Sequence, residues 1–187
     1  MNTKIVLNVG CGKSPLSDQT SYFDGWKEIR VDAFENDTAD IISTILDLKE
    51  IETQSVDAVW ASHIVEHCYF HELPDVFNSI IRVLKDDGFA VITVPDLASI
   101  ADKIRIGLLD TIYESSAGPI TSLDILYGSR LHIQNGEIGM QHKTGFTEKS
   151  MSQILSSLNI KALTKTQSYE VVSVLYKNTI PDYINHN

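Results

Sequence analysis

The sequence predicts an α/β protein: a doubly wound, three-layer sandwich around a mainly parallel sheet. Three observations support this fold class. Short β-branched apolar runs alternate with helical stretches, the first run ends in a glycine turn, and aspartates follow two of the next runs. Strands that alternate with helices form right-handed βαβ units, which bring the carboxyl ends of the strands to one edge. Ligands bind at that edge in such folds.

Five strands are expected in the first half of the chain. Each is a short apolar run that ends at a turn-forming or polar residue. The expected ranges are 4–9, 28–31, 40–46, 56–61 and 89–94. Four potential ligand-binding points follow these strands and converge on one sheet edge: Gly10–Gly12, Asp32, Asp47 and Ser62–His63.

The clearest helix lies between the fourth and fifth strands. Pro74 suits its first turn, and Asp87-Gly88 predicts its end. Its apolar residues share one helical face: Leu73, Val76, Phe77, Ile80, Ile81 and Leu84.

The second half of the chain is expected to hold two more helices and two strands. A helix is expected over 97–109, and Thr147 is placed to cap another one. Two strands should follow, over 160–166 and 170–177. The segment 110–146 has no steady period and is expected to be irregular, with one helical turn near 122–126.

Length and composition favour one globular domain over residues 1–187. The 15 basic and 25 acidic residues give a formal charge of −10, without the basic clusters of nucleic-acid-binding proteins. No apolar run approaches the roughly 20 residues of a membrane helix, and the chain does not begin like a signal peptide. Cys11 and Cys68 form no disulfide framework by spacing. These features together predict a cytoplasmic protein that binds neither nucleic acid nor membranes.

The glycine turn and the acid that follows the second strand suggest a nucleotide-type ligand. Glycines at 10 and 12 permit positive φ and let a ligand approach bare backbone. Asp32 lies twenty residues after Gly12, where a carboxylate accepts hydrogen bonds from ribose hydroxyls in dinucleotide-binding folds. A plain strand-to-helix turn and a solvated strand-end carboxylate are the alternatives.

These motifs together resemble the class I methyltransferases that use S-adenosylmethionine, in particular the small type 11 group. The resemblance covers residues 4–96 well and the rest loosely. It is carried by three segments: Asn8-Val9-Gly10-Cys11-Gly12, residues 55–67 and residues 82–89. It implies a seven-stranded sheet whose last strand is antiparallel. It also assigns ribose binding to Asp32 and adenine recognition to the carboxylate and backbone of Asp47-Leu48.

The expected halves of the domain are a cofactor half, residues 1–96, and an acceptor half, residues 97–187. The predicted function is methyl transfer from S-adenosylmethionine to a small-molecule or glycan-type acceptor, and a homodimer is compatible with the sequence. The expected cofactor-binding residues are Asn8, Gly10, Cys11, Gly12, Asp32, Ala33, Asp47, Leu48, Ser62 and His63.

Two other functions remain open. Asn8 stands where the family commonly has an acid, Ser14 replaces a frequent third glycine, and residues 13–27 are short for a helix and a loop. These departures would fit an S-adenosylmethionine-binding protein without transferase activity. A nicotinamide-dependent oxidoreductase would need Gly-x-Gly-x-x-Gly, but Pro15 occupies the place of the last glycine.

On the acceptor side, His142 is the expected catalytic residue. Methyl transfer is an in-line displacement, and a base is needed only where the nucleophile must lose a proton. A surface-loop role is the alternative for His142, as it is for Tyr127, Arg130 and His132, and Asp96 is a further residue that could face the acceptor.

The histidines after the fourth strand raise the question of a metal site. The relevant residues are His63, Glu66, His67 and His71. The spacing of four residues would put His63 and His67 on one helix face, and likewise His67 and His71 if the helix persists. Their order does not match the metalloprotease pattern, which has a glutamate directly after the first histidine. Structural hydrogen bonding is the favoured role for Glu66 and His67, and no metal is expected.

Overall fold

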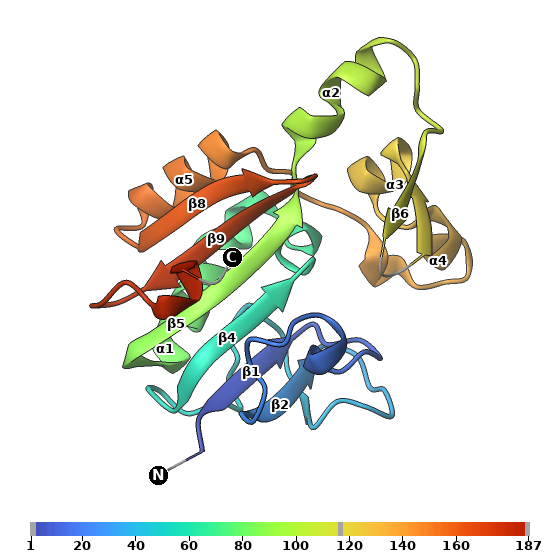
Figure 1. Cartoon of the computed structure of the whole chain (residues 1–187). Helices are drawn as coiled ribbons and strands as arrows, with labels where there is room; N and C mark the ends of the chain where they lie inside the picture. The colour runs from blue at the N-terminus through green and yellow to red at the C-terminus, as the bar shows by residue number, and fades with distance from the viewer. Residues whose placement is uncertain (1–2, 116–117, 186–187) are drawn as a thin grey trace.

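The computed structural model describes residues 3–115 and 118–185. Its main sheet has seven strands in the order β3-β2-β1-β4-β5-β9-β8 (Figure 1). The first five of these are parallel to one another, and β9 runs antiparallel between β5 and β8. The strands are β1 Ile5–Val9, β2 Lys27–Asp32, β3 Ile41–Ile42, β4 Val56–Ser62, β5 Leu84–Pro95, β8 Lys161–Gln167 and β9 Glu170–Tyr176. The predicted mainly parallel sheet with an antiparallel last strand is confirmed.

Helices α1 (Leu73–Val83) and α5 (Glu148–Ser157) cover the same face of the sheet (Figure 1). Thr147 caps α5 by accepting a hydrogen bond from the backbone N–H of Ser150, at 3.2 Å, as its sequence position predicted. The apolar face of α1 is buried except at Ile81, which is partly buried, because the helix packs with α5 on alternate residues of the strands. The buried residues of this contact include Leu73, Val76, Phe77, Ile80, Met151, Leu155, Leu7, Val59 and Ile92.

The opposite face is covered by irregular chain. Residues 13–26 contain only the short 3-10 helix η1 (Leu16–Asp18), and the 3-10 helix η5 (Asp182–Asn185) lies over the same face. Their aromatic side chains pack on the sheet, and the Trp60 indole N–H donates to the side-chain oxygen of Gln19 at 2.9 Å. The aromatic cluster consists of Tyr22, Phe23, Trp26, Trp60, Phe89 and Tyr183. This layer leaves the β9 side of the face more open.

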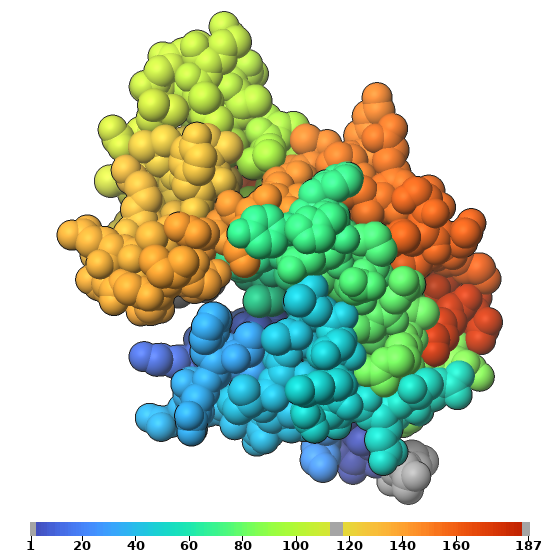
Figure 2. All heavy atoms as spheres, turned by 180° about the vertical axis from the view of Figure 1, so that it is seen from behind, coloured from blue at the N-terminus to red at the C-terminus, as the bar shows by residue number. Residues whose placement is uncertain are grey.

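Residues 97–146 form a cap beyond the carboxyl ends of the strands. The expectation of an irregular segment over 110–146 was wrong, although the helical turn near 122–126 is present within α3. Figure 2 shows the cap standing over the N-terminal half, with a hollow between them. The cap elements are α2 Leu97–Arg105, β6 Ile112–Ser115, β7 Gly118–Thr121, α3 Ser122–Tyr127, α4 Arg130–Gln134 and the 3-10 helix η4 Ile138–Met140.

Four elements differ from their expected boundaries by more than two residues: β3, α1, α2 and β5, which begins at Leu84 rather than at residue 89. Strand β3 spans only Ile41–Ile42. Helix α1 ends at Val83, because Leu84 is extended and already pairs with Val56, so Asp87-Gly88 lies inside β5 next to a register shift. Helix α2 ends at Arg105 rather than near residue 109. Within the described residues, no helix has the length and apolar character needed to cross a membrane.

Candidate functional site

The glycine turn after β1 uses its two glycines for different physical reasons. Gly10 has φ +70°, and a Cβ there would come within 2.9 Å of the Ile64 side chain. Gly12 has φ +51°, but a Cβ there would meet no atom within 4 Å. Gly10 is therefore required by packing, whereas Gly12 presents bare backbone to open space where a ligand can approach.

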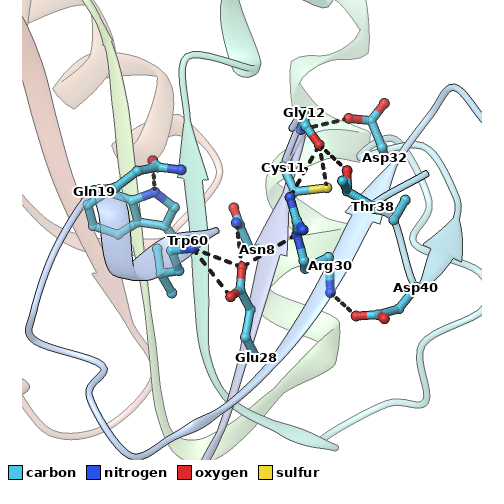
Figure 3. Close-up of polar contacts among 12 residues, drawn as sticks. Asn8, Cys11, Gly12, Gln19, Glu28, Arg30, Asp32, Thr38, Asp40 and Trp60 are labelled. Carbon is cyan, nitrogen blue, oxygen red and sulfur yellow. Dashed lines mark hydrogen bonds and ion pairs between the residues drawn. The ribbon is translucent and has the colours of Figure 1, made fainter. Parts of the chain in front are cut away.

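Asp32 at the end of β2 stabilises this turn through hydrogen bonds (Figure 3). Its carboxylate accepts hydrogen bonds from the backbone N–H groups of Gly12 and Phe34, each at 3.0 Å. The Gly12 carbonyl in turn accepts from the Thr38 hydroxyl at 2.6 Å. Each carboxylate oxygen can accept more than one hydrogen bond, so ribose recognition remains open to Asp32. Ala33 follows it on the exposed loop.

Asn8 is buried in β1 and points toward β2 (Figure 3). Its side-chain amide donates to the Glu28 carboxylate at 2.8 Å, and the same carboxylate accepts from the Leu16 backbone at 3.1 Å. An acid at position 8 would place a second carboxylate against Glu28, which would disfavour ionisation of both. Asn8, which departs from the family pattern, is thus matched by Glu28 on the neighbouring strand, whose carboxylate accepts its hydrogen bond.

Asp47 and Leu48 are engaged in local structure after β3. The Leu48 side chain is fully buried, and its backbone N–H donates to the Thr44 carbonyl at 3.0 Å. The carbonyls of Asp47 and Leu48 both accept from the Arg82 guanidinium at 2.9 Å. This connection fixes the loop against α1.

A cleft of about 940 Å³ runs from the glycine turn along the strand ends and beneath the cap. The expected site residues that line it are Cys11, Gly12, Ser62, His63 and His142. The other expected residues lie outside its lining: Asn8, Gly10, Asp32, Ala33, Asp47 and Leu48. Both cysteines are free and buried, and burial together with the Asp32 charge raises the pKa of the Cys11 thiol.

His63 lies directly after β4, with φ +51°, and bridges two acids. Its Nε2 is 2.8 Å from the Glu170 carboxylate, and its Nδ1 is 3.3 Å from the Glu66 carboxylate. Burial disfavours the charged ring, but the hydrogen bonds to Glu170 and Glu66 outweigh it and raise the pKa of His63 to about 10. The ring is therefore charged at neutral pH.

The structure brings Glu66, His67 and His142 together at the base of the cap. One ligand atom from each lies within 4.8 Å of the others. Burial opposes ionisation of Glu66, but its hydrogen bond with His63 and the neighbouring histidines hold its pKa below the usual value. Burial likewise lowers the pKa of His142, despite the nearby Glu66 charge.

The expected helical grouping of the histidines was wrong. The chain forms only the 3-10 helix η2 (Val65–His67), because Cys68 is extended, and a second 3-10 helix η3 (Phe70–Glu72) follows. His71 stacks on Tyr69 and does not join the cluster. No local pattern in the sequence connects Glu66 and His67 with His142, which lies 75 residues after His67.

The other acceptor-side candidates have mainly local partners. Asp96 is buried and caps α2 by accepting from the backbone of Ala98 and Ser99. Arg130 pairs with Asp124 at 3.0 Å, and Nδ1 of His132 lies 2.7 Å from the Ser129 hydroxyl. Tyr127 is largely exposed. Asp96 is therefore engaged in capping α2 and is not among the residues that line the cleft.

Residues 7–92 match a family model described as a methyltransferase domain. The matched segment covers slightly less than half of the chain. It contains the glycine turn, the second-strand acid and the β4–α1 segment on which the resemblance rested. This match supports the predicted enzyme class, an S-adenosylmethionine-dependent methyltransferase, and its predicted cofactor. No curated protein is significantly similar to the sequence.

Solved structures with the same fold extend the likeness over nearly the whole chain. A 1,6-didemethyltoxoflavin-N1-methyltransferase from Burkholderia thailandensis is 13% identical, with a TM-score of 0.62 over 95% of this chain and 72% of that one. The PH0226 protein from Pyrococcus horikoshii is 16% identical, with a TM-score of 0.59 over 94% and 83%. A SAM-dependent methyltransferase from Archaeoglobus fulgidus is 16% identical, with a TM-score of 0.57 over 92% and 86%.

Proposed function

We propose that the methyltransferase transfers the methyl group of S-adenosylmethionine to a small-molecule or glycan-type acceptor within the 940 Å³ cleft. The observation that carries this proposal is the continuity of the cleft. It joins the open backbone at Gly12 and the end of β4 to His142 beneath the cap. Cofactor and acceptor would therefore share one cavity, as an in-line displacement requires.

The cofactor is placed at the glycine-turn end. Gly12, Cys11, Ser62 and His63 would contact its methionine part, because they line the cleft at the strand ends. Asp32 would bind the ribose beside the turn that it supports, and Asp47-Leu48 would lie toward the adenine. Asn8 and Gly10 would act indirectly, by holding β1 and the turn in place.

The acceptor is placed under the cap. The cavity has the size of small-molecule sites, and the chain is too acidic to favour a phosphate backbone. The Burkholderia protein was crystallised with bound 1,6-didemethyltoxoflavin, a small molecule. The two buried free cysteines fit a reducing compartment such as the cytoplasm, and a homodimer is compatible with this arrangement.

Titration calorimetry with S-adenosylmethionine, S-adenosylhomocysteine and NAD tests the cofactor assignment. Both adenosyl ligands should bind, and NAD should not. Incubation with S-adenosylmethionine and pooled small-molecule acceptors should then yield a product heavier by one methyl substitution in mass spectrometry. Binding without any product over a broad acceptor panel would favour the non-catalytic alternative, whereas binding of NAD alone would overturn the assignment.

His142 is proposed to act on the acceptor rather than the cofactor. It lies beneath the cap, and its Nδ1 is held 2.9 Å from the Ile125 carbonyl, so its Nε2 is the nitrogen available to the cluster with Glu66 and His67. His142→Ala should leave the Kd for S-adenosylhomocysteine within about twofold and lower turnover by roughly 100-fold or more, the range of a lost catalytic group. His71→Ala, at an exposed histidine outside the cluster, is the control. Equal turnover in His142→Ala and the wild type would remove His142 from the site.

A further inference from the structure

Two histidines in the cluster use the same ring nitrogen, Nδ1, to contact a backbone carbonyl. Nδ1 of His67 lies 3.0 Å from the Gln141 carbonyl, and Nδ1 of His142 lies 2.9 Å from the Ile125 carbonyl. A carbonyl oxygen accepts but cannot donate, so each Nδ1 carries the proton of a neutral ring and each Nε2 keeps its lone pair. Metal-binding histidines are typically oriented in this way, with the second ring nitrogen bonded to a backbone carbonyl.

The carboxylate of Glu66 supplies an independent observation. Glu66 is only 1% exposed, and its Oε1 is bonded to His63. Its Oε2 is buried and has no hydrogen-bond partner among the described residues. Leaving a buried charged oxygen unsatisfied is costly, so such an atom indicates a ligand. The imidazoles of His67 and His142 each offer a ligand atom within 4.8 Å of a carboxylate oxygen of Glu66.

The backbone around the cluster is already fixed. The Glu66 carbonyl accepts from the backbone N–H groups of Lys143 and Thr144 at 2.8 and 3.1 Å. The Thr144 hydroxyl donates to the Cys68 carbonyl at 2.5 Å. The His142 backbone N–H donates to the Tyr127 backbone carbonyl at 3.2 Å. The segment around η2 is thus joined to the loop after η4 on both sides of the cluster, so its three donors stay close without a ligand to order the chain.

From this arrangement we propose that Glu66, His67 and His142 bind a zinc-class divalent cation that faces the cleft. Two imidazoles and one carboxylate with open positions are a typical donor set of catalytic zinc and of related divalent metals. Ligand atoms at zinc bond lengths lie roughly 3.3 Å apart. The ligand atoms now lie within 4.8 Å of one another, so side-chain rotations have to bring them closer together when the ion binds. The two imidazoles lie edge to face, with ring centroids 4.9 Å apart and 76° between their planes.

The role of this ion in catalysis rests on the proposed methyl transfer. An acceptor hydroxyl bound at an open position of the ion would lose its proton to solvent, because a divalent cation lowers the pKa of bound oxygen ligands. The resulting alkoxide would form the new C–O bond to the methyl carbon. The C–S bond would break, and its electron pair would stay on sulfur as the neutral thioether. This assigns a hydroxyl-bearing acceptor to the cleft.

Metal titration tests the site without any need for an acceptor. The full-length protein, freed of metals with a chelator, is titrated with Zn²⁺ by calorimetry and with Co²⁺ by visible absorption. One ion per chain should bind, and the Co²⁺ spectrum should show d–d bands without the thiolate charge-transfer band that Cys11 or Cys68 would produce. Glu66→Gln and His142→Gln should each weaken Zn²⁺ binding more than about 100-fold, since even supporting partners of metal ligands contribute 10- to 100-fold.

A matched control separates this site from nonspecific binding. His71→Gln removes a histidine outside the cluster and should leave Zn²⁺ affinity unchanged. Circular dichroism and thermal unfolding check that each variant folds. If Glu66→Gln does not fold, His67→Gln provides a second variant of a ligand residue. Zn²⁺ binding that is unaffected in the ligand variants, or no stoichiometric binding at all, would overturn the proposal. S-adenosylhomocysteine affinity is measured in the same samples, so failure of the metal site is distinguishable from failure of the cofactor assignment.

Discussion

The two ends of the cleft satisfy their polar groups in opposite ways. At the glycine turn, Asp32 accepts from Gly12 and Phe34, and Asn8 donates to Glu28. At the cap end, a buried oxygen of Glu66 has no hydrogen-bond partner within the described chain, beside two histidines. The first region is held largely by its own side chains, although Nε of Arg30 is buried there without a hydrogen bond, 3.9 Å from the Glu28 carboxylate. The second has the chemistry of a site that is completed by a ligand.

The two regions also differ in how far apart in the sequence their contacting residues lie. The contacts of the glycine turn connect residues within one βαβ-like unit, 18 to 26 positions apart. The cap-end cluster joins Glu66 and His67 to a loop 74 or more residues away. A short motif can encode the first kind of region. The second exists only once the cap has folded over the strand ends.

The largest expected effect compares the two glycines of the turn. Gly10→Ala should destabilise the protein by about 3 kcal/mol, because it combines overpacking against Ile64 with a positive φ. Gly12→Ala carries the φ penalty alone and should cost about 1 kcal/mol, but it should weaken S-adenosylmethionine binding because its methyl group enters the open space. Urea unfolding and calorimetry measure the two effects. Equal stability losses would show that the Ile64 contact relaxes freely.

The next effect compares two expected cofactor acids. Asp32→Ala should weaken S-adenosylhomocysteine binding roughly 10- to 150-fold, because a hydrogen bond to a charged group contributes about 1.5–3 kcal/mol. Asp47→Ala should have a smaller effect in the same direction, since backbone groups share adenine recognition. Calorimetry on both variants, with unfolding curves as the control, provides the comparison. Unchanged affinity in Asp32→Ala would limit Asp32 to supporting Gly12 and Phe34.

Most of the sheet could be predicted from the sequence, because its strands are short β-branched runs ending at turn residues. The exceptions have physical causes. After Ser43, whose backbone N–H still donates to the Asp32 carbonyl, the chain turns, which limits β3 to Ile41–Ile42. Asp87-Gly88 does mark a break in regular structure, but this break is the register shift near the start of β5 and not the end of α1. The hairpin β6–β7 has no strong alternation and forms within the cap.

The site was predictable where one motif carries it. The positions of Gly12 and Asp32 follow from the turn and its spacing, and His63 does lie at the end of β4. The helical spacing of His63 and His67 was misleading, because Cys68 is extended and ends the turn. The partnership of Glu66 with His142 depends on hydrogen bonds between two loops. No local pattern in the sequence reports those bonds.

The smallest expected effect concerns the cap itself, through Asp124. Burial disfavours its charged form, but hydrogen bonds from Arg130 and Thr121 outweigh this and lower the pKa of Asp124 to about 2. An unfolded aspartate titrates near ~3.9. The charged form therefore stabilises the folded cap above about pH 4, and this stabilisation is lost as the pH falls toward 2. The side chain of Arg130 is 48% exposed, so screening reduces the contribution to about 1 kcal/mol.

Asp124→Asn should therefore lower stability by about 1 kcal/mol at pH 7, with the difference from wild type shrinking between pH 4 and pH 2. Urea unfolding at several pH values measures this difference. Asp110→Asn is the matched control, because Asp110 lies 3.9 Å from the same arginine and is 84% exposed. If the cap holds His142 in place through Ile125 and Tyr127, Asp124→Asn should also weaken Zn²⁺ binding, whereas Asp110→Asn should not. A constant stability difference down to pH 2 would show that the carboxylate charge does not stabilise the cap.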